Sequence, residues 1–594
     1  MKLTQIYSNS ITFKSVKFND KFNIVLGDIK YEEDLNKDSH NLGKSTLIAL
    51  IDFLLLKTID KKHFFRNSAF ENHIFFLELE LNNDSYLTIM RAIRNSSKVS
   101  IKSHESPYMD LRNEIDWDYF ELGLNASDPN NNPIEILNRY LGFDVLSGYS
   151  FRNTVNYFFR TQNDYIDVFK LNKFRGKDLD WKPILFELLG FSSKDMIDKY
   201  KLDSEKNQKE TLISQIEAEF SVCEEDVDKI KGLIEIKQQE RLVIIKWLDG
   251  FDFYQQDEIV QKELITDIES KISTLNTEKY NLDYEINQID KSLQLDIPYD
   301  IQEIKSIYEE VQVLLPGQLV KSYQELLEFN KKVFNERKQY LSKAKENKQQ
   351  RLKQIDIKLR ELNRQRMNSL STFTHTDTFA KYNRYREQLI NVERELEHYT
   401  SELENLDVIK RLNQELVKID EQINKAVNAI KEQIDNSNHL YRSIQKDFHD
   451  YVKTIINQDG MVSLSVNQNG NVDFNDSIVN EHNESTSQND GHTYKKILCA
   501  CFDLALIKNY MSNSFYRTVY HDGCLESLDP RKQKQYLRLV RGLSDEYGFQ
   551  YILTALKSDI PSSEVEDYSL KPYEIAVTLS DEEDDSGRLF GFVF

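Results

Sequence analysis

The stretch Asn41-Leu42-Gly43-Lys44-Ser45-Thr46 comes after a strand-like run, Asn23–Leu26, and opens an apolar helical run. The N-terminus of a helix offers free N–H groups and a positive partial charge to an anion. Gly43 lets the backbone approach phosphate oxygens, Lys44 supplies a positive charge, and the Ser45 hydroxyl is placed to bind Mg²⁺. The stretch therefore predicts a site for nucleotide phosphates.

The loop ahead of this helix departs from the consensus G-x-x-x-x-G-K-[ST]. The position of the first consensus glycine is Asp38, whereas the glycine that ends the strand is Gly27. Residues 28–39 are therefore predicted to be a polar insertion within the loop. A chance Gly-Lys-Ser-Thr at a helix cap would show the same letters, so the prediction needs support from other parts of the chain.

The composition of the 594 residues predicts a globular part combined with long solvated helices, because 40% are hydrophobic and 29% are charged. The formal net charge of -21 repels polyanions at long range, so binding to nucleic acid would require a local basic patch. The four cysteines, at 223, 499, 501 and 524, form no disulfide framework and no Cys-x-x-Cys metal pair. The chain shows neither an N-terminal apolar leader nor an apolar run of about 18 residues, so we expect a cytoplasmic protein without a membrane segment.

Residues 198–449 contain few glycines and prolines, whereas the segments on either side have mixed α/β patterns. Two runs within 198–449 place apolar and aromatic residues at alternating steps of three and four, which is typical of a left-handed coiled coil. The two runs are Ile268, Ile272, Leu275, Leu282, Ile286, Ile289 and Leu293, and Tyr382, Tyr385, Leu389, Val392, Leu396, Tyr399, Leu403 and Leu406. We expect 1–197 and 450–594 to be two lobes of one head, and 198–449 to be an antiparallel coiled-coil arm with its tip near 369–378.

The pairing of helices within the arm can be predicted only from their lengths. On that basis, 378–449 is expected to pack against 323–368, and 198–246 against 257–295.

A second group of polar residues follows a strand pattern near the C-terminus. The apolar run Phe515–Tyr520 ends in His521-Asp522, and a carboxylate at such a strand end can reach the Mg²⁺ shell of a nucleotide. Asp529 lies seven residues beyond Asp522, within Ser527-Leu528-Asp529. These residues predict that the C-terminal part of the chain completes the phosphate site.

Two further segments fit this arrangement. Gln162 follows the apolar and aromatic run Tyr157–Phe159 in the N-terminal part of the chain. Asp490-Gly491-His492-Thr493 stands directly before a predicted helix over 493–510. In the ATP-binding cassette heads that the chain resembles, the first place holds the Q-loop glutamine, and the second holds the signature motif that caps the γ-phosphate of a partner subunit.

This order of motifs, interrupted by a coiled coil, resembles that of ATP-binding cassette heads and of SMC-like ATPases such as RecN and SbcC. The resemblance implies an α/β fold, a split P-loop ATPase head with an inserted antiparallel coiled-coil arm. It also implies that ATP and Mg²⁺ bind to matched residues from both lobes. The implied ATP-binding residues are Asn41, Gly43, Lys44, Ser45, Thr46, Gln162, Gly491, Thr493 and Asp529, and the implied metal ligands are Ser45, Gln162 and Asp522.

Four segments resemble more closely the ABC-three-component class of bacterial defence ATPases, and the chain is similar in outline to the SMC-like subunit of Lamassu anti-phage systems. These segments are Ser39–Leu47, Phe158–Asp164, Gly491–Leu506 and Gln550–Thr554. The resemblance implies a homodimer through the heads, a partner effector such as a nuclease, a small accessory subunit, and DNA.

Three departures from the family pattern concern catalysis. Gly523 stands where a general-base glutamate is expected beside Asp522, and Ala555 stands where a switch histidine is expected. The segment ahead of the 493–510 helix lacks the usual serine–glycine–glycine string. A general base contributes roughly 10²–10⁴-fold to a rate, so its loss predicts slow hydrolysis with binding intact. His521 and Glu526 are the candidate substitute bases.

Three functions remain open on the sequence alone. The first is an ATP-binding switch that dimerises through its heads, senses or clamps DNA, and controls a defence effector. The second is an active DNA-repair ATPase that works with a nuclease. The third is a coiled-coil scaffold with a degenerate nucleotide site. Nucleotide binding, turnover and stimulation by DNA distinguish them.

Overall fold

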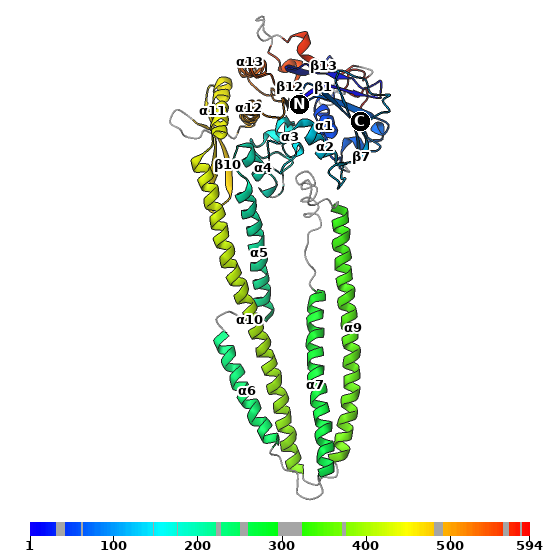
Figure 1. Ribbon diagram of the computed structural model, residues 1–594, viewed down its shortest axis with the longest axis vertical. Coiled ribbons are helices and arrows are strands. Elements are labelled where there is room, and N and C mark those ends of the chain that lie inside the picture. Colours follow the sequence, from blue (N-terminus) through cyan, green and yellow to red (C-terminus); the bar gives the residue numbers. More distant parts are fainter. Residues whose placement is uncertain are drawn as a thin grey trace. The chain divides into compact units, whose positions relative to one another are not determined.

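The computed structural model describes residues 1–30, 42–60, 63–146, 148–174, 176, 178–220, 227–249, 259–294, 323–370, 376–479, 491–561, 570–582 and 585–594. The chain divides into two compact units, and we call them the head and the arm. The head contains Met1–Tyr200 and Asn424–Phe594, so both ends of the chain lie in it (Figure 1). The arm contains the described residues between Lys201 and Ile423.

A five-stranded parallel sheet forms the centre of the head. Its strand order is β13-β3-β12-β11-β8, and every neighbouring pair is parallel. The strands are β3 (Phe22–Asp28), β8 (Phe159–Arg160), β11 (Thr518–Asp522), β12 (Gln550–Leu556) and β13 (Ile575–Ser580). Strands from the two ends of the chain therefore alternate, and neither the N-terminal nor the C-terminal part forms this sheet by itself.

Two antiparallel sheets accompany the parallel one. The larger has the order β2-β1-β4-β5-β6-β7 and comes from the N-terminal part alone. Its strands are β1 (Lys2–Ser8), β2 (Val16–Lys17), β4 (Ile74–Glu80), β5 (Tyr86–Ala92), β6 (Lys98–His104) and β7 (Tyr119–Gly123). The smaller is the hairpin of β9 (Asp459–Val466) and β10 (Val472–Val479).

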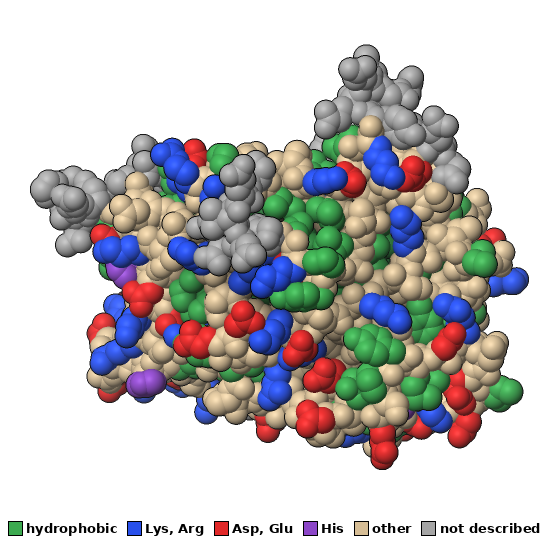
Figure 2. Space-filling view, turned by 90° about the horizontal axis from the view of Figure 1, so that it is seen from above, with side chains coloured by type: hydrophobic (Ala, Val, Ile, Leu, Met, Phe, Trp, Pro, Cys, Tyr) green, Lys and Arg blue, Asp and Glu red, His purple; other side chains and the backbone are tan. Residues whose placement is uncertain are grey.

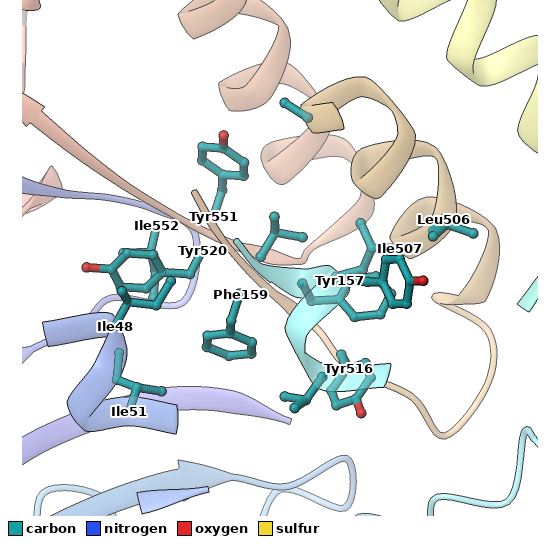
Figure 3. Close-up of a cluster of buried hydrophobic side chains, with 14 of the residues drawn as sticks. Ile48, Ile51, Tyr157, Phe159, Leu506, Ile507, Tyr516, Tyr520, Tyr551 and Ile552 are labelled. Carbon is teal, nitrogen blue, oxygen red and sulfur yellow. The ribbon is translucent and has the colours of Figure 1, made fainter. Parts of the chain in front are cut away.

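Helices from both ends of the chain complete the head. They are α1 (Lys44–Leu54), α2 (Pro133–Leu141), α3 (Phe151–Phe158), α4 (Lys182–Leu188), α11 (His439–Ile456), α12 (His492–Tyr510) and α13 (Pro530–Tyr547). Figure 3 shows how Ile48 and Ile51 of α1, Tyr157 of α3 and Leu506 and Ile507 of α12 surround the strands. Apolar burial of this extent is the dominant favourable term in folding.

The C-terminal lobe of the head begins before residue 450, which was the boundary expected from the sequence. Helix α11 places Tyr441, Ile444, Phe448 and Val452 on its buried side, and all four belong to the core of the head. Their spacing of three and four residues gives α11 one apolar face, which explains why this helix packs in the head. The predicted fold class, an α/β split P-loop head with an inserted coiled-coil arm, is confirmed.

Five long helices account for the described residues of the arm and of its ends. They are α5 (Lys194–Phe220), α6 (Val227–Asp249), α7 (Ile259–Gln294), α9 (Tyr323–Leu370) and α10 (Thr376–Asn436). None of the described helices is both long enough and apolar enough to cross a membrane. Half of the predicted tip at 369–378 lies outside the described residues, because 371–375 are not described.

The helix pairing expected from lengths alone is wrong. Helix α7 pairs with α9 in antiparallel fashion through four ion pairs, Arg351–Glu278, Lys279–Asp356, Lys348–Glu285 and Lys345–Asp290. Helices α5 and α6 each pair with α10, through Lys206–Asp420, Lys209–Glu415, Lys237–Glu395 and Arg241–Glu393. Register and partner choice in coiled coils follow from seam packing and flanking charges, which length does not report.

A buried ion pair joins the two ends of the chain in the head. Arg160 of β8 donates from Nε and Nη2 to the carboxylate of Asp503 in α12, at 2.5 and 2.9 Å, and both side chains are fully buried. The remaining guanidinium N–H groups donate to the carbonyls of residues 164, 167 and 168. Removing one partner of such a pair leaves an uncompensated buried charge.

We predict that Asp503→Ala lowers the free energy of unfolding of the head by about 3–5 kcal/mol. Asp545→Ala is the matched control, because Asp545 also pairs with a cation from the other end of the chain, Lys21, but both side chains are exposed. Such exposed pairs contribute about 0–1 kcal/mol. Urea unfolding followed by circular dichroism measures the free energy of unfolding of both variants. Equal losses in the two variants would contradict a stabilising role for the buried Arg160–Asp503 pair.

Candidate nucleotide-binding site

The N-terminus of α1 is held in a conformation that suits a phosphate. Gly43 precedes the helix with φ +100°, a left-handed backbone that favours glycine. A Cβ at this position would lie 2.6 Å from Cβ of Leu589, so no side chain fits. No side chain among the described residues caps the N-terminus of α1, so its first N–H groups are available to bind an anion. Asn41 lies outside the described residues.

Lys44 extends across the end of β3. A Cβ on Gly27 would lie 3.2 Å from Cδ of Lys44, so the absence of a side chain at Gly27 gives the lysine its path. Burial lowers the pKa of Lys44, while Glu526 and then Asp522 oppose this shift by their negative charges. Lys44 therefore lies in a partly desolvated site, with three carboxylates from the C-terminal lobe, those of Glu526, Asp522 and Asp559, close enough to influence it.

Asp522 is the last residue of β11, and the hydrogen bonding of its carboxylate is the main evidence for the site. Its Oδ1 accepts a hydrogen bond from the Thr554 hydroxyl of β12, and that hydroxyl accepts from the Gly523 N–H at 2.8 Å. Its Oδ2 is buried and has no hydrogen-bond partner among the described residues. Burial raises the pKa of Asp522, and the opposing influences come from Thr554, the hydroxyl of Ser45 and the charge of Lys44.

These contacts fit a bound magnesium–triphosphate. A buried carboxylate oxygen without a partner is costly unless a cation or donor completes it. Mg²⁺ prefers oxygen ligands, and Ser45 and Asp522 offer a hydroxyl and a carboxylate beside Lys44. The metal, when bound, supplies charge neutralisation for the phosphates. Lys44 would pair with phosphate oxygens, and the N–H groups of α1 would orient them.

Gln162 reaches the same site from the N-terminal lobe. It begins the 3₁₀ turn Gln162–Tyr165 directly after β8, and its Nε2 donates to Oε1 of Glu526 at 3.0 Å. Gly523 adopts φ +66°, and a Cβ there would lie 2.7 Å from Nε2 of Gln162 and 3.0 Å from Cδ of Glu526. Residue 523 is therefore a glycine for a structural reason, and Glu526 is the carboxylate that lies beside Gln162.

Lys496 is a site residue that the sequence did not reveal. It is buried on α12, its Nζ donates to the Gly523 carbonyl at 3.0 Å, and the same Nζ lies 3.7 Å from Oε2 of Glu526. The one signal in the sequence is a lysine next to the continuous apolar run that begins at Ile497. Lys496 fixes the turn after Asp522 and orients Glu526.

His521, a candidate substitute base, does not lie in the site. Its ring is fully buried, with Nδ1 hydrogen-bonded to the Tyr551 hydroxyl at 2.7 Å and Nε2 to Asp503 at 3.1 Å. Burial lowers its pKa. Successive side chains on a strand point to opposite faces, so a histidine next to Asp522 points away from the nucleotide.

The remaining predicted residues begin two helices of the C-terminal lobe. Gly491 precedes α12, which contains Thr493 in its first turn. Asp529 caps α13 by accepting from the Arg531 N–H at 2.9 Å, and it forms an exposed ion pair with the same arginine. Their described contacts are local. A role in ATP binding would require a second head, as the resemblance implies.

Comparisons with known proteins give relatives without an assigned activity. Residues 451–594 match a family described as "Uncharacterised protein conserved in bacteria (DUF2326)". The "Uncharacterized protein YydD" of Bacillus subtilis (strain 168) is 21% identical over 608 residues, which cover 98% of this chain and 97% of the relative.

Two solved structures align with most of the chain. The Smc head domain with a coiled coil and joint from Pyrococcus yayanosii has 12% identity and a TM-score of 0.31, covering 93% of this chain and 92% of that one. The Smc head domain with an extended coiled coil, bound to the C-terminal domain of ScpA, from Pyrococcus furiosus has 10% identity and a TM-score of 0.29, covering 94% and 90%. At these scores the likeness adds no argument, and the class of the chain, a split P-loop head with a coiled-coil arm, follows from its own sheet order and site.

We predict that Lys44→Ala abolishes binding of Mg-ATP in isothermal titration calorimetry. The change removes the charge that pairs with the phosphates in a partly desolvated site. Lys21→Ala is the control, because Lys21 is exposed and paired with Asp545. Unchanged affinity of the Lys44 variant would place the phosphate site elsewhere.

Asp522→Asn is expected to have opposite effects on binding and on stability. Burial raises the pKa of Asp522, so its ionised form is unfavourable in the folded protein. The free energy of unfolding of the wild type should therefore increase as the pH falls through that raised pKa. The neutral amide removes this penalty, so the melting temperature without nucleotide should rise at pH 7 and lose that pH dependence. The affinity for Mg-ATP should fall. If Asp522→Asn lowered the melting temperature and left the affinity for Mg-ATP unchanged, Asp522 would not be part of the nucleotide site.

Proposed function

We propose that this protein is an SMC-like ATP-binding switch, in which Mg-ATP binds between the two lobes of the head and brings two heads together. The partnerless Oδ2 of Asp522, next to Ser45 and Lys44, is the observation that carries the proposal. Residues from opposite ends of the chain contribute to one buried polar site, which is the arrangement that a phosphate-bound cation requires.

ATP acts in this proposal by its different affinities for two states of the protein. A ligand shifts an equilibrium only by the difference in its binding free energy between the states. In a head dimer, Gly491 and Thr493 at the start of α12 would add donors to the nucleotide held by Lys44 of the other copy. A single head makes only half of these contacts, so ATP favours the dimer.

The partners and the biological role in this proposal rest on the resemblance to bacterial defence ATPases. The dimer would sense or clamp DNA and control an effector, such as a nuclease, with a small accessory subunit. The face of the molecule shown in Figure 2 mixes basic with acidic side chains among the described residues. With a net charge of -21, DNA contact would depend on short-range positioning of a few cations.

An active repair-type ATPase is the second candidate, and the placement of Glu526 favours it. This carboxylate accepts from Gln162, influences Lys44 more than Asp522 does, and is held by Lys496. A carboxylate in this position could orient and deprotonate a water that attacks the terminal phosphate. The third candidate function, a coiled-coil scaffold with a degenerate nucleotide site, has no comparable support.

We predict that Mg-ATP converts the protein from monomer to dimer, and that Lys44→Ala stays monomeric under the same conditions. The contacts of Gly491 and Thr493 with a nucleotide exist only between two copies in the proposal. Sedimentation velocity with and without Mg-ATP measures the change. A wild-type protein that binds ATP and remains monomeric at concentrations well above the Kd for ATP would refute the switch.

Glu526→Gln separates the switch from the repair-type enzyme. The amide keeps an oxygen that accepts from Gln162 but cannot take up a proton, so a base role predicts a drop of about 10²–10⁴-fold in single-turnover hydrolysis. The switch predicts slow hydrolysis in the wild type and little further loss. Glu546→Gln is the control at an exposed position of α13. A large drop, or strong stimulation of turnover by DNA, would favour the repair-type enzyme.

A further inference from the structure

The segment after β13 runs directly to the phosphate site. Strand β13 lies parallel to β3, with Leu579 opposite Gly27 and Ser580 opposite Asp28. The chain then turns back, because the Ser580 N–H donates to the Gly587 carbonyl at 2.9 Å. A Cβ on Gly587 would lie 2.2 Å from the Ser580 oxygen, so only glycine permits this close turn.

This segment contacts both described ends of the insertion that interrupts the phosphate loop. The Asp581 carboxylate accepts from the Lys30 backbone N–H at 2.7 Å. On the other side, the Leu589 N–H donates to the Leu42 carbonyl at 3.1 Å, and Cβ of Leu589 lies directly against Gly43. Residues just before and just after the insertion are therefore held by the same short piece of chain.

An aromatic cluster anchors the segment. Phe590 is buried, with ring centroids 5.0 Å from Phe70, 5.6 Å from Phe13 and 6.0 Å from Phe75. Phe592 and Phe594 extend the cluster by packing against Phe70 at 5.2 and 4.8 Å. Aromatic side chains supply large buried areas with few rotatable bonds, so they can fix a short segment firmly.

We infer that Asp581 and residues 585–594 form a latch that positions Leu42 and Gly43, at the start of α1, for ATP, and that Leu589 and Phe590 are its positioning residues. This inference rests on the proposed binding of ATP to the head. The latch touches the backbone of Leu42 and Gly43 and makes no contact with the nucleotide itself in this scheme.

The physical basis is preorganisation. A loop that is already ordered binds its ligand more tightly, because less conformational entropy is lost on binding. The coupling is reciprocal, since a latch that favours the ATP-bound loop must itself be stabilised when ATP binds. A segment that serves only general stability would show no such response to the nucleotide.

Hydrogen exchange of the wild-type chain, with and without Mg-ATP, tests the reciprocal effect. The latch predicts slower exchange at residues 588–592, which include the Leu589 N–H, as well as in the first turn of α1. Protection of α1 with unchanged exchange at 588–592 would overturn the latch and leave the proposed function intact. Absence of ATP binding to the wild type would overturn the proposed function, and the latch with it.

A matched pair of variants tests the direct effect. Phe590→Ala loosens the latch, whereas Phe549→Ala removes an equally buried phenylalanine that stands directly before β12. At a temperature where both variants keep the wild-type circular dichroism spectrum, Phe590→Ala should weaken Mg-ATP binding about tenfold and Phe549→Ala about twofold or less. Equal effects would overturn the inference, and if Phe590→Ala does not fold, the exchange experiment decides.

Discussion

The parallel pairing of β3 with β12 is the constraint on which the rest of the head depends. It runs from Phe22 opposite Tyr551 to Gly27 opposite Leu556, so it joins the first and last parts of the chain by backbone hydrogen bonds. Since the carboxyl ends of parallel strands lie at one edge of a sheet, the loop to α1 and the end of β11 meet there. A shift in the register of this pair would separate Lys44 from Asp522.

The two faces of β11 have different functions. On one face Asp522 stays buried with an open oxygen, an arrangement that costs stability and is typical of sites that bind a cation. On the other face His521 joins the Asp503–Arg160 pair, which ties together β11, α12 and β8. The turn that carries Gln162 follows β8 directly. A well-satisfied polar network on one face of β11 thus holds in place the strand that carries Asp522 on the other face.

Much of the head could be predicted because local chemistry determined it. Gly43, Lys44 and Ser45 follow from the geometry of a phosphate at a helix start, and Asp522 from its place at the end of an apolar strand. What failed depends on contacts between distant residues. Pairing of α7 with α9 depends on complementary charges along the helices. The direction of His521, by contrast, follows from strand alternation once Asp522 faces the site, so the sequence already contained it. The positions of Lys496 and Leu589 depend on turns that no spacing in the sequence reports.

Affinity cleavage at the metal tests most directly the claim that the two ends of the chain build one Mg-ATP site. Fe²⁺ replaces Mg²⁺ in the presence of ATP, and ascorbate with peroxide then cuts the backbone next to the bound iron. A shared site predicts ATP-dependent cuts at two places in the same chain, near Ser45 and near Asp522, and neither cut in Lys44→Ala. Cleavage near only one of them, or cleavage that does not depend on ATP, would contradict the shared site.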